Sequence, residues 1–212
     1  MIYCSRGSMF FSKRVRCKSA GKLIVGLGNP DSVYSLTRHN AGAQAVKRFA
    51  KENNFIFKKS CILKGFFAQG HIDTEVVSLL LPQTYMNLSG GAVAAYLKRK
   101  PTPLEDILIV YDDIALPLGQ VRLKPHGSAG GHNGLANVIE RLVTQNIARL
   151  RIGIAGDHFE NLSDYVLSKF GTHEKIVLNE ALNFAVQAMK AWILEDIDRV
   201  MSSYNIKNKI RE

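Results

Sequence analysis

The sequence predicts a single α/β domain built on a twisted, mostly parallel, mixed central sheet with helices on both faces. Short apolar segments that read as strands alternate with longer segments whose apolar residues recur at helical spacing. The first strand is continuously apolar, as in a sheet covered on both faces. The length of 212 residues suits one core, and we find no internal repeat. We expect the domain at 22–206, a basic extension at 1–21 and a basic tail at 207–212.

Strands and helices can be assigned in order along the first half of the chain. A strand at 22–26 precedes a helix at 40–53, in which Ala45, Val46 and Phe49 share one face. Two strands at 66–72 and 76–81 form a hairpin, and Pro82 stops the second of them. A loop then leads into a helix at 89–99.

The second half repeats this alternation. Prolines separate the helix from a central strand at 107–110, which ends at Tyr111-Asp112-Asp113. A strand at 120–124 runs into a glycine-rich turn and a helix at 135–142. A strand follows in which basic and apolar residues alternate, and a long amphipathic helix and a short terminal helix close the domain. These last three elements are expected at 148–154, at 174–194 and from 197.

The composition restricts the partners. A formal net charge of +10 favours an anionic partner, with nucleic acid ahead of a membrane surface, although a merely basic protein would share it. No apolar run reaches the ~18 residues of a membrane span. The cysteines Cys4, Cys17 and Cys61 lack paired spacing and neighbouring histidines, so we expect free thiols in the cytoplasm and no zinc site. An organelle transit peptide at the acid-free N-terminus is the alternative.

Four loops that follow strands carry groups suited to chemistry. Asn29 follows the first strand, Met86-Asn87 the third, Asp112 ends the central strand, and His132-Asn133 follows the glycine-rich turn. Ligand sites in open α/β sheets lie beyond the carboxyl ends of strands, so we expect these loops to converge.

Several kinds of site are excluded by spacing. The segment Gly26-Leu27-Gly28-Asn29-Pro30-Asp31 lacks the third glycine of a dinucleotide fingerprint, and neither a Walker lysine motif nor a G-x-S-x-G elbow is present. His39, Asp112 and His132 show no i, i+4 ligand pairing, so we expect no metal and no cofactor.

A water nucleophile activated by a histidine is the simplest remaining hydrolytic scheme. A lone histidine such as His39 is more often structural, but Asp112 could hold its ring in the tautomer that accepts a proton from water. Asp113 is the competing carboxylate, and because adjacent strand residues point to opposite faces, only one of the two is expected to serve.

Neutral and basic side chains suggest what the site would bind. Asparagine is common in turns, but together Asn29, Asn87 and Asn133 would suit a peptide, with Tyr34, Tyr85 and Met86 as apolar walls. Basic residues alternate with apolar ones on two of the predicted strands, at Arg122, Lys124, Arg149 and Arg151. These basic side chains form either a phosphate-binding patch or a solvated sheet face, and the sequence leaves both open.

From Lys22 to about Ile206 the chain resembles the bacterial-type peptidyl-tRNA hydrolases. The segments that carry the resemblance are LIVGLGNP with TRHNAG, PQTYMNLSG, VYDDIALPLGQVRLK, GSAGGHNG and ARLRIG. Their order and spacing together are far more specific than any one motif.

The resemblance implies hydrolysis of the ester that joins a peptide to the 3′ end of tRNA, without metal or cofactor. We separately expect the protein to be a monomer. His39 matches the family's general base, Asp112 the acid that keeps it basic, and Asn29 the residue associated with separating N-blocked from free aminoacyl-tRNA. Four residues match positions that contact the substrate, and His132 lies in the same wall; the four are Tyr34, Tyr85, Asn87 and Asn133. Two basic residues, Lys124 and Arg151, match residues that hold tRNA phosphate, so that peptidyl-tRNA is the implied partner.

The chain also departs from the family pattern. His158 stands near the position of a frequent lysine, in a shortened segment, and the extension before Lys22 is unusual. Three other functions compete: a non-catalytic RNA-binding scaffold, a nucleotide-dependent oxidoreductase and an esterase for small molecules. The pair His39 and Asp112 argues against the first, the broken glycine fingerprint against the second, and the basic patch against the third.

Overall fold

The computed structural model describes residues 21–156 and 161–207. The predicted extension and tail, and His158, therefore fall almost entirely outside the described residues. Within them the chain folds around one seven-stranded sheet, in the order β2-β3-β4-β1-β5-β7-β6. The strands are β1 Lys22–Gly26, β2 Lys58–Ser60, β3 Gly65–Ile72, β4 Glu75–Pro82, β5 Ile107–Pro117, β6 Val121–Lys124 and β7 Ala148–Ala155.

The sheet is mixed, as predicted. Its centre is parallel, because β1 pairs in parallel with both β4 and β5, and β5 pairs in parallel with β7. The outer strands β2, β3 and β6 pair antiparallel to their neighbours. The chain thus returns to each side of β1 in turn, and loops from β1, β4 and β5 leave from one end of the sheet.

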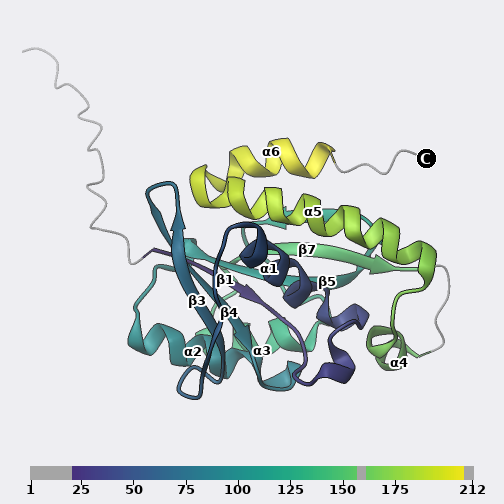
Figure 1. The fold of residues 1–212 in the computed structure, drawn as a ribbon, viewed down its shortest axis with the longest axis horizontal. Coiled ribbons are helices and arrows are strands. Elements are labelled where there is room, and N and C mark those ends of the chain that lie inside the picture. The colour runs from purple at the N-terminus through teal and green to yellow at the C-terminus, as the bar shows by residue number, and fades with distance from the viewer. Residues whose placement is uncertain (1–20, 157–160, 208–212) are drawn as a thin grey trace, which may run out of the picture.

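Helices cover both faces (Figure 1). The helix α1 packs with α5 on one face, while α2 packs with α3 on the other. Ile24 of β1 faces the first of these cores, and Leu23 and Val25 face the second, which explains why that strand is continuously apolar. The helices are α1 Ala41–Glu52, α2 Ser89–Arg99, α3 Asn133–Leu142, α4 Leu162–Leu167, α5 Thr172–Leu194 and α6 Ile197–Lys207.

Short 3₁₀ turns occupy several of the loops. They are η1 Ser32–Tyr34, η2 Arg38–Asn40, η3 Met86–Leu88 and η4 Leu104–Asp106. Three of these turns carry residues that the sequence assigned to the site. None of the helices in the described ranges is long and apolar enough to cross a membrane.

Two elements were not predicted, and one strand is longer than expected. Edge strand β2 has the sequence Lys-Lys-Ser without apolar alternation, and α4 has only six residues, none of them buried. The prediction that Asp112 ends the central strand was wrong. Strand β5 continues to Pro117, because β7 goes on pairing with it at Asp112 and Asp113, beyond the last residue of β1.

Candidate active site

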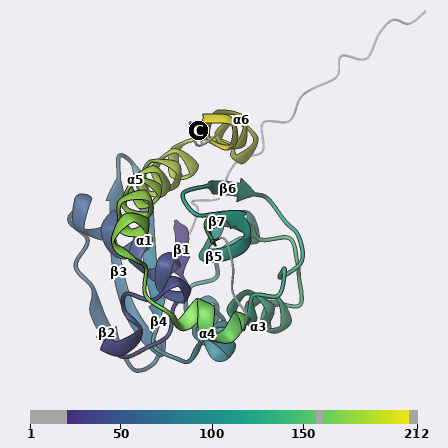
Figure 2. The same ribbon diagram turned by 90° about the vertical axis from the view of Figure 1, so that its right-hand side faces the viewer.

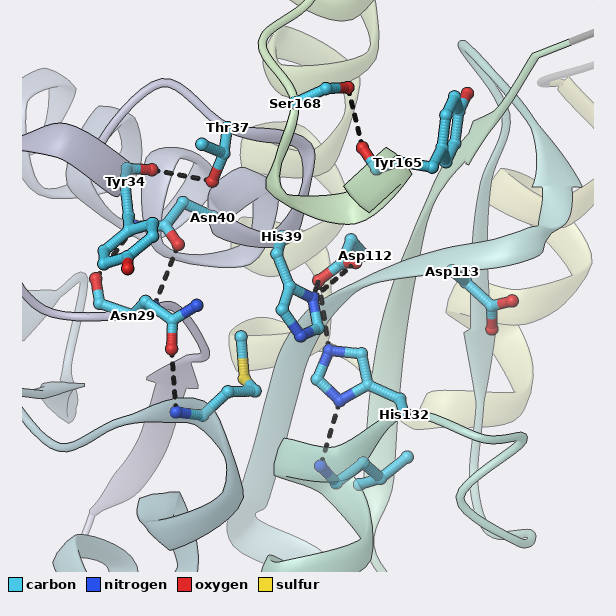
Figure 3. A network of polar contacts seen from close by, with 12 residues as sticks. Asn29, Tyr34, Thr37, His39, Asn40, Asp112, Asp113, His132, Tyr165 and Ser168 are labelled. Atoms are coloured by element: carbon cyan, nitrogen blue, oxygen red, sulfur yellow. Dashed lines mark hydrogen bonds and ion pairs between the residues drawn. The ribbon is translucent and has the colours of Figure 1, made fainter. Parts of the chain in front are cut away.

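The two residues predicted to form a catalytic pair lie in direct contact. Nδ1 of His39 lies 2.9 Å from Oδ2 and 3.1 Å from Oδ1 of Asp112 (Figure 3). Both residues are buried, with 8% and 2% of their surfaces exposed. His39 belongs to η2, directly before α1, whereas Asp112 lies in β5 just past the end of β1. The carboxylate therefore reaches across the top of the parallel strands to the histidine.

A glycine allows this approach. A Cβ at Gly42, in the first turn of α1, would lie 2.3 Å from the carbonyl oxygen of Val110 and 2.8 Å from Cα of Tyr111. Any larger residue would push the start of α1 away from β5. The contact between His39 and Asp112 thus depends on helix and strand backbones that nearly touch.

A second histidine binds the same carboxylate. Nε2 of His132 lies 3.0 Å from Oδ1 of Asp112, and the backbone N–H of Leu135 donates to its Nδ1 at 3.1 Å. The rings of His39 and His132 are 4.8 Å apart (Figure 3). The sequence predicts His132 only as part of a substrate-contacting wall, so its bond to Asp112 is a finding of the structure.

The three side chains also form a cluster of possible metal ligands, which their spacing in the sequence had argued against. Their ligand atoms lie within 4.8 Å of one another. The hydrogen bonds nevertheless suit a proton network better. Since Nδ1 of His132 accepts from the Leu135 amide, the neutral ring carries its proton on Nε2, which then donates to Asp112 and has no lone pair for a metal.

Charge on Asp112 is stabilised by its surroundings. Burial alone raises the pKa of this carboxyl, but His132 and His39 outweigh the effect and hold the pKa below its ordinary value. Asp113, the competing carboxylate, points elsewhere: its Oδ2 accepts from Nε of Arg151 at 2.6 Å and from the hydroxyl of Tyr111 at 3.3 Å. Only Asp112 bonds to His39, as the alternation of strand side chains predicted.

Asn29 lies in a loop that is held from both sides. The backbone N–H of Asn29 donates to Oδ1 of Asn40 at 2.9 Å, and Nδ2 of Asn40 donates to the backbone carbonyl of Asn29 at 3.0 Å. Oδ1 of Asn29 accepts from the backbone N–H of Met86 at 2.8 Å (Figure 3). That bond fixes the orientation of the amide, so its NH2 end is the one available to a ligand.

Two adjoining hollows meet at His39. The larger, of about 520 Å³, is lined by the predicted residues Asn29, Tyr34, Tyr85, Met86, Asn87 and Asn133. The smaller contains His39, Asp112, His132 and the glycine pair Gly130-Gly131. His39 and Asn133 line both hollows. The three predicted asparagines therefore do converge beside the histidine.

Helix α4 supplies a wall that the sequence did not reveal. Ser163 and Val166 line both hollows, and Leu162 lines the smaller one. Figure 2 shows α4 at the edge where α3 begins. The signal was weak: Leu162 and Val166 stand at i, i+4, and the side chain of Asn161 caps the helix by accepting from the Ser163 N–H.

Arg38 anchors this wall to the histidine. Its Nη2 lies 2.8 and 2.7 Å from the two carboxylate oxygens of Glu174, and its Nε donates to Oγ of Ser168. The guanidinium carbon lies over the rings of Tyr165 and Phe170, at 4.3 and 4.7 Å from their centroids. Because Arg38 adjoins His39 in η2, the histidine backbone is tied to α4 and to the start of α5.

The alternating basic strand residues divide into different roles. Arg149 is 1% exposed and donates to the carbonyls of Gly127 and Ser128, so its suggested place in a phosphate patch was wrong. Arg151 is half-buried and bonded to Asp113, while Lys124 is exposed. Neither Lys124 nor Arg151 lines the two hollows, although Asp113 lines the smaller one.

Comparison with known proteins gives a consistent result. The chain matches the family model described as peptidyl-tRNA hydrolase over residues 23–212. A peptidyl-tRNA hydrolase of Dehalococcoides mccartyi is 43% identical over 188 residues, which cover 87% of this chain and 99% of the relative. One from Clostridium acetobutylicum is 40% identical over 183 residues, covering 86% of this chain and 97% of the relative.

A crystal structure shares the fold as well. Peptidyl-tRNA hydrolase from Acinetobacter baumannii superimposes with a TM-score of 0.83 at 37% identity, covering 88% of this chain and 95% of that one. The resemblance seen in the sequence is thus confirmed along nearly the whole length of the relatives. On these grounds the chain belongs to the peptidyl-tRNA hydrolase family.

Proposed function

We propose that this protein hydrolyses the ester between a peptide, or an N-blocked amino acid, and the 3′ end of tRNA. His39 acts as the general base. The observation that carries the proposal is its bond to Asp112 at the junction of two hollows. Because Nδ1 of His39 donates to Asp112, its Nε2 keeps a lone pair for a proton of water.

The reaction then proceeds without a covalent enzyme intermediate. The oxygen of water attacks the ester carbonyl while His39 takes a proton, and the tetrahedral intermediate collapses by breaking the bond to the 3′ oxygen. That oxygen receives the proton from His39 and becomes the tRNA 3′ hydroxyl, and the second proton of the water stays on the peptide carboxylic acid, which then releases it to solvent to give the carboxylate. Asp112 stabilises the imidazolium that exists between the two steps.

The two hollows suit the two halves of the substrate. In the larger one, the NH2 group of Asn29 donates to a peptide carbonyl, and Asn87 and Asn133 supply further neutral partners. Tyr34, Tyr85 and Met86 form its less polar walls. The smaller hollow takes the 3′ end of the tRNA, on the side where Arg151 bonds to Asp113. Lys124 lies in β6 opposite Arg149 and is the further basic residue proposed to meet tRNA phosphate.

The test compares N-acetyl-aminoacyl-tRNA with the unblocked aminoacyl-tRNA. We expect release of the blocked amino acid, loss of that release in His39→Ala, and full activity in His173→Ala, an exposed histidine on α5. Binding of tRNA without cleavage by the unaltered protein would indicate the scaffold function and refute the enzyme. Cleavage of the unblocked substrate at a similar rate would remove the discriminating role of Asn29.

The setting is part of the same proposal: a monomer in the cytoplasm that needs no metal. Protein dialysed against EDTA should retain its rate when assayed with Mg²⁺ present to keep the tRNA folded. A loss of rate that zinc restores would show that the cluster of His39, Asp112 and His132 holds a metal instead. Sedimentation of the protein tests the monomer.

A further inference from the structure

His132 makes two bonds that together define one protonation form. Its Nδ1 accepts from the N–H of Leu135, in the first turn of α3, and its Nε2 faces Oδ1 of Asp112. A neutral imidazole carries a single proton, and the amide donor requires that this proton sit on Nε2. The backbone of α3 therefore selects the tautomer that donates to Asp112.

The ring of His132 has little freedom to leave this position. It is 8% exposed, it packs edge-on against Tyr111 with centroids 4.8 Å apart, and it caps α3. A Cβ at Gly134 would lie 3.0 Å from Cε1 of His132 and 2.5 Å from Sδ of Met86. Packing from β5, η3 and α3 thus fixes where its N–H points.

Asp112 consequently receives donors from two sides. Its Oδ1 accepts from His132, and the same carboxylate accepts from Nδ1 of His39, most closely at Oδ2. A carboxylate with one fixed oxygen cannot rotate about its Cβ–Cγ bond, so the oxygen that faces His39 keeps its place. A water molecule in place of the His132 ring could donate a hydrogen bond to Asp112, but it would not prevent the carboxylate from rotating about its Cβ–Cγ bond.

We propose that His132 is a positioning residue: through Asp112 it fixes the orientation of His39. This inference rests on the proposed function and extends it to a residue that need not touch the reacting atoms.

Two variants separate the two roles of His132, which donates a hydrogen bond to Asp112 and caps the start of α3. His132→Asn can keep an oxygen at the position of Nδ1 to accept from the Leu135 N–H, but it loses the donor to Asp112. His132→Gln keeps a donor near the position of Nε2 but loses the capping acceptor. If His132 only stabilises the helix, Asn should be the more active variant; if it positions Asp112, Gln should be.

We expect kcat of His132→Asn to fall about tenfold or more with KM little changed, and His132→Gln to recover part of the loss. Unchanged kcat in a folded His132→Asn protein, or a His132→Asn variant more active than His132→Gln, would overturn the proposal.

The tautomer of His132 can be determined by NMR, independently of any activity assay. Long-range ¹H–¹⁵N correlation spectra of the unaltered protein at neutral pH should show His132 protonated at Nε2 and bare at Nδ1. A proton on Nδ1 would refute the inference even if the enzyme is active. Conversely, the expected tautomer in a protein that does not cleave peptidyl-tRNA would refute only the proposed function.

Discussion

Replacing Asp112 by Asn tests the catalytic pair most directly, because the change preserves shape. The Nε2–H of His132 requires an acceptor, so the amide oxygen must take the place of Oδ1, 3.0 Å from that nitrogen. The amide NH2 then takes the place of Oδ2, 2.9 Å from Nδ1 of His39. Two N–H groups cannot face each other there, so His39 must move its proton to Nε2, which can then no longer accept one from water.

The loss of activity follows from the loss of the His39 tautomer whose Nε2 can accept a proton from water. The same substitution in a Ser-His-Asp triad lowers kcat by about 10⁴-fold, so we expect a loss of about 10³–10⁴, or ~4–5.5 kcal/mol in the activation barrier. Single-turnover release of N-acetyl-amino acid from tRNA measures it. Asp113→Asn is the matched control and should lose far less. Activity of a folded Asp112→Asn protein within tenfold of the unaltered enzyme would refute the scheme.

The same variant should change the response of stability to acid. The pKa of Asp112 is held below its ordinary value of 3.8, because the two histidines outweigh the effect of burial. A depressed pKa contributes stability that is fully present above the unfolded value and is lost as the pH falls below it. Urea unfolding between pH 5 and 2 should show a shallower loss in Asp112→Asn than in the unaltered protein; parallel curves would contradict this assignment.

Three further changes probe the surroundings of the pair. Gly42→Ala places a Cβ 2.3 Å from the carbonyl of Val110, so α1 must shift; we expect about 10²-fold lower activity and about 1–3 kcal/mol lower unfolding free energy. Arg38→Lys loses the stacked guanidinium and weakens the pair with Glu174; unfolding free energy should fall by about 2 kcal/mol and the pKa of Glu174 should rise in NMR titration. Lys124→Ala should weaken tRNA binding, and the fall of log K with log[salt] should become less steep by about 0.9.

Each of these changes has a control. Gly91→Ala, on α2, meets no atom within 4 Å and should leave activity intact. Arg199→Lys alters an exposed arginine and should not affect stability measurably. Lys190→Ala, on α5, should keep the salt slope unchanged. Full activity in Gly42→Ala, an unchanged melting curve in Arg38→Lys, or an unchanged slope in Lys124→Ala would contradict the corresponding assignment.

Periodicity predicted the fold wherever an element carries an apolar face or is buried throughout. β1 and α2 were assigned with their observed bounds for this reason. β2 and α4 lack such a face, since β2 lies at the sheet edge and α4 buries none of its residues, so tertiary contacts rather than local pattern create them. The length of β5 depends on its pairing with β7, which no local pattern reports.

The candidate site was predictable in its members more than in their contacts. Asn29 and His39 could be chosen because they lie near the end of a strand and the start of a helix. Asp112 could be chosen because it closely follows the apolar segment at 107–110, although β5 continues beyond it. The bond between His132 and Asp112 could not, because it joins residues that are 20 positions apart through a sheet and a helix start. Arg149 and Arg151 show the same alternation in sequence, yet only the structure shows that one is enclosed by backbone carbonyls.

The anchoring of Arg38 has a consequence for the order in which the chain is synthesised. His39 is made early, but the partners that hold its neighbour, Ser168 and Glu174, come 130 and 136 residues later than Arg38. A chain still being translated would therefore carry the base long before the segment around it could be fixed. We expect the protein to become competent only when synthesis is nearly complete, so that an interrupted copy would itself remain on tRNA as a substrate for finished ones.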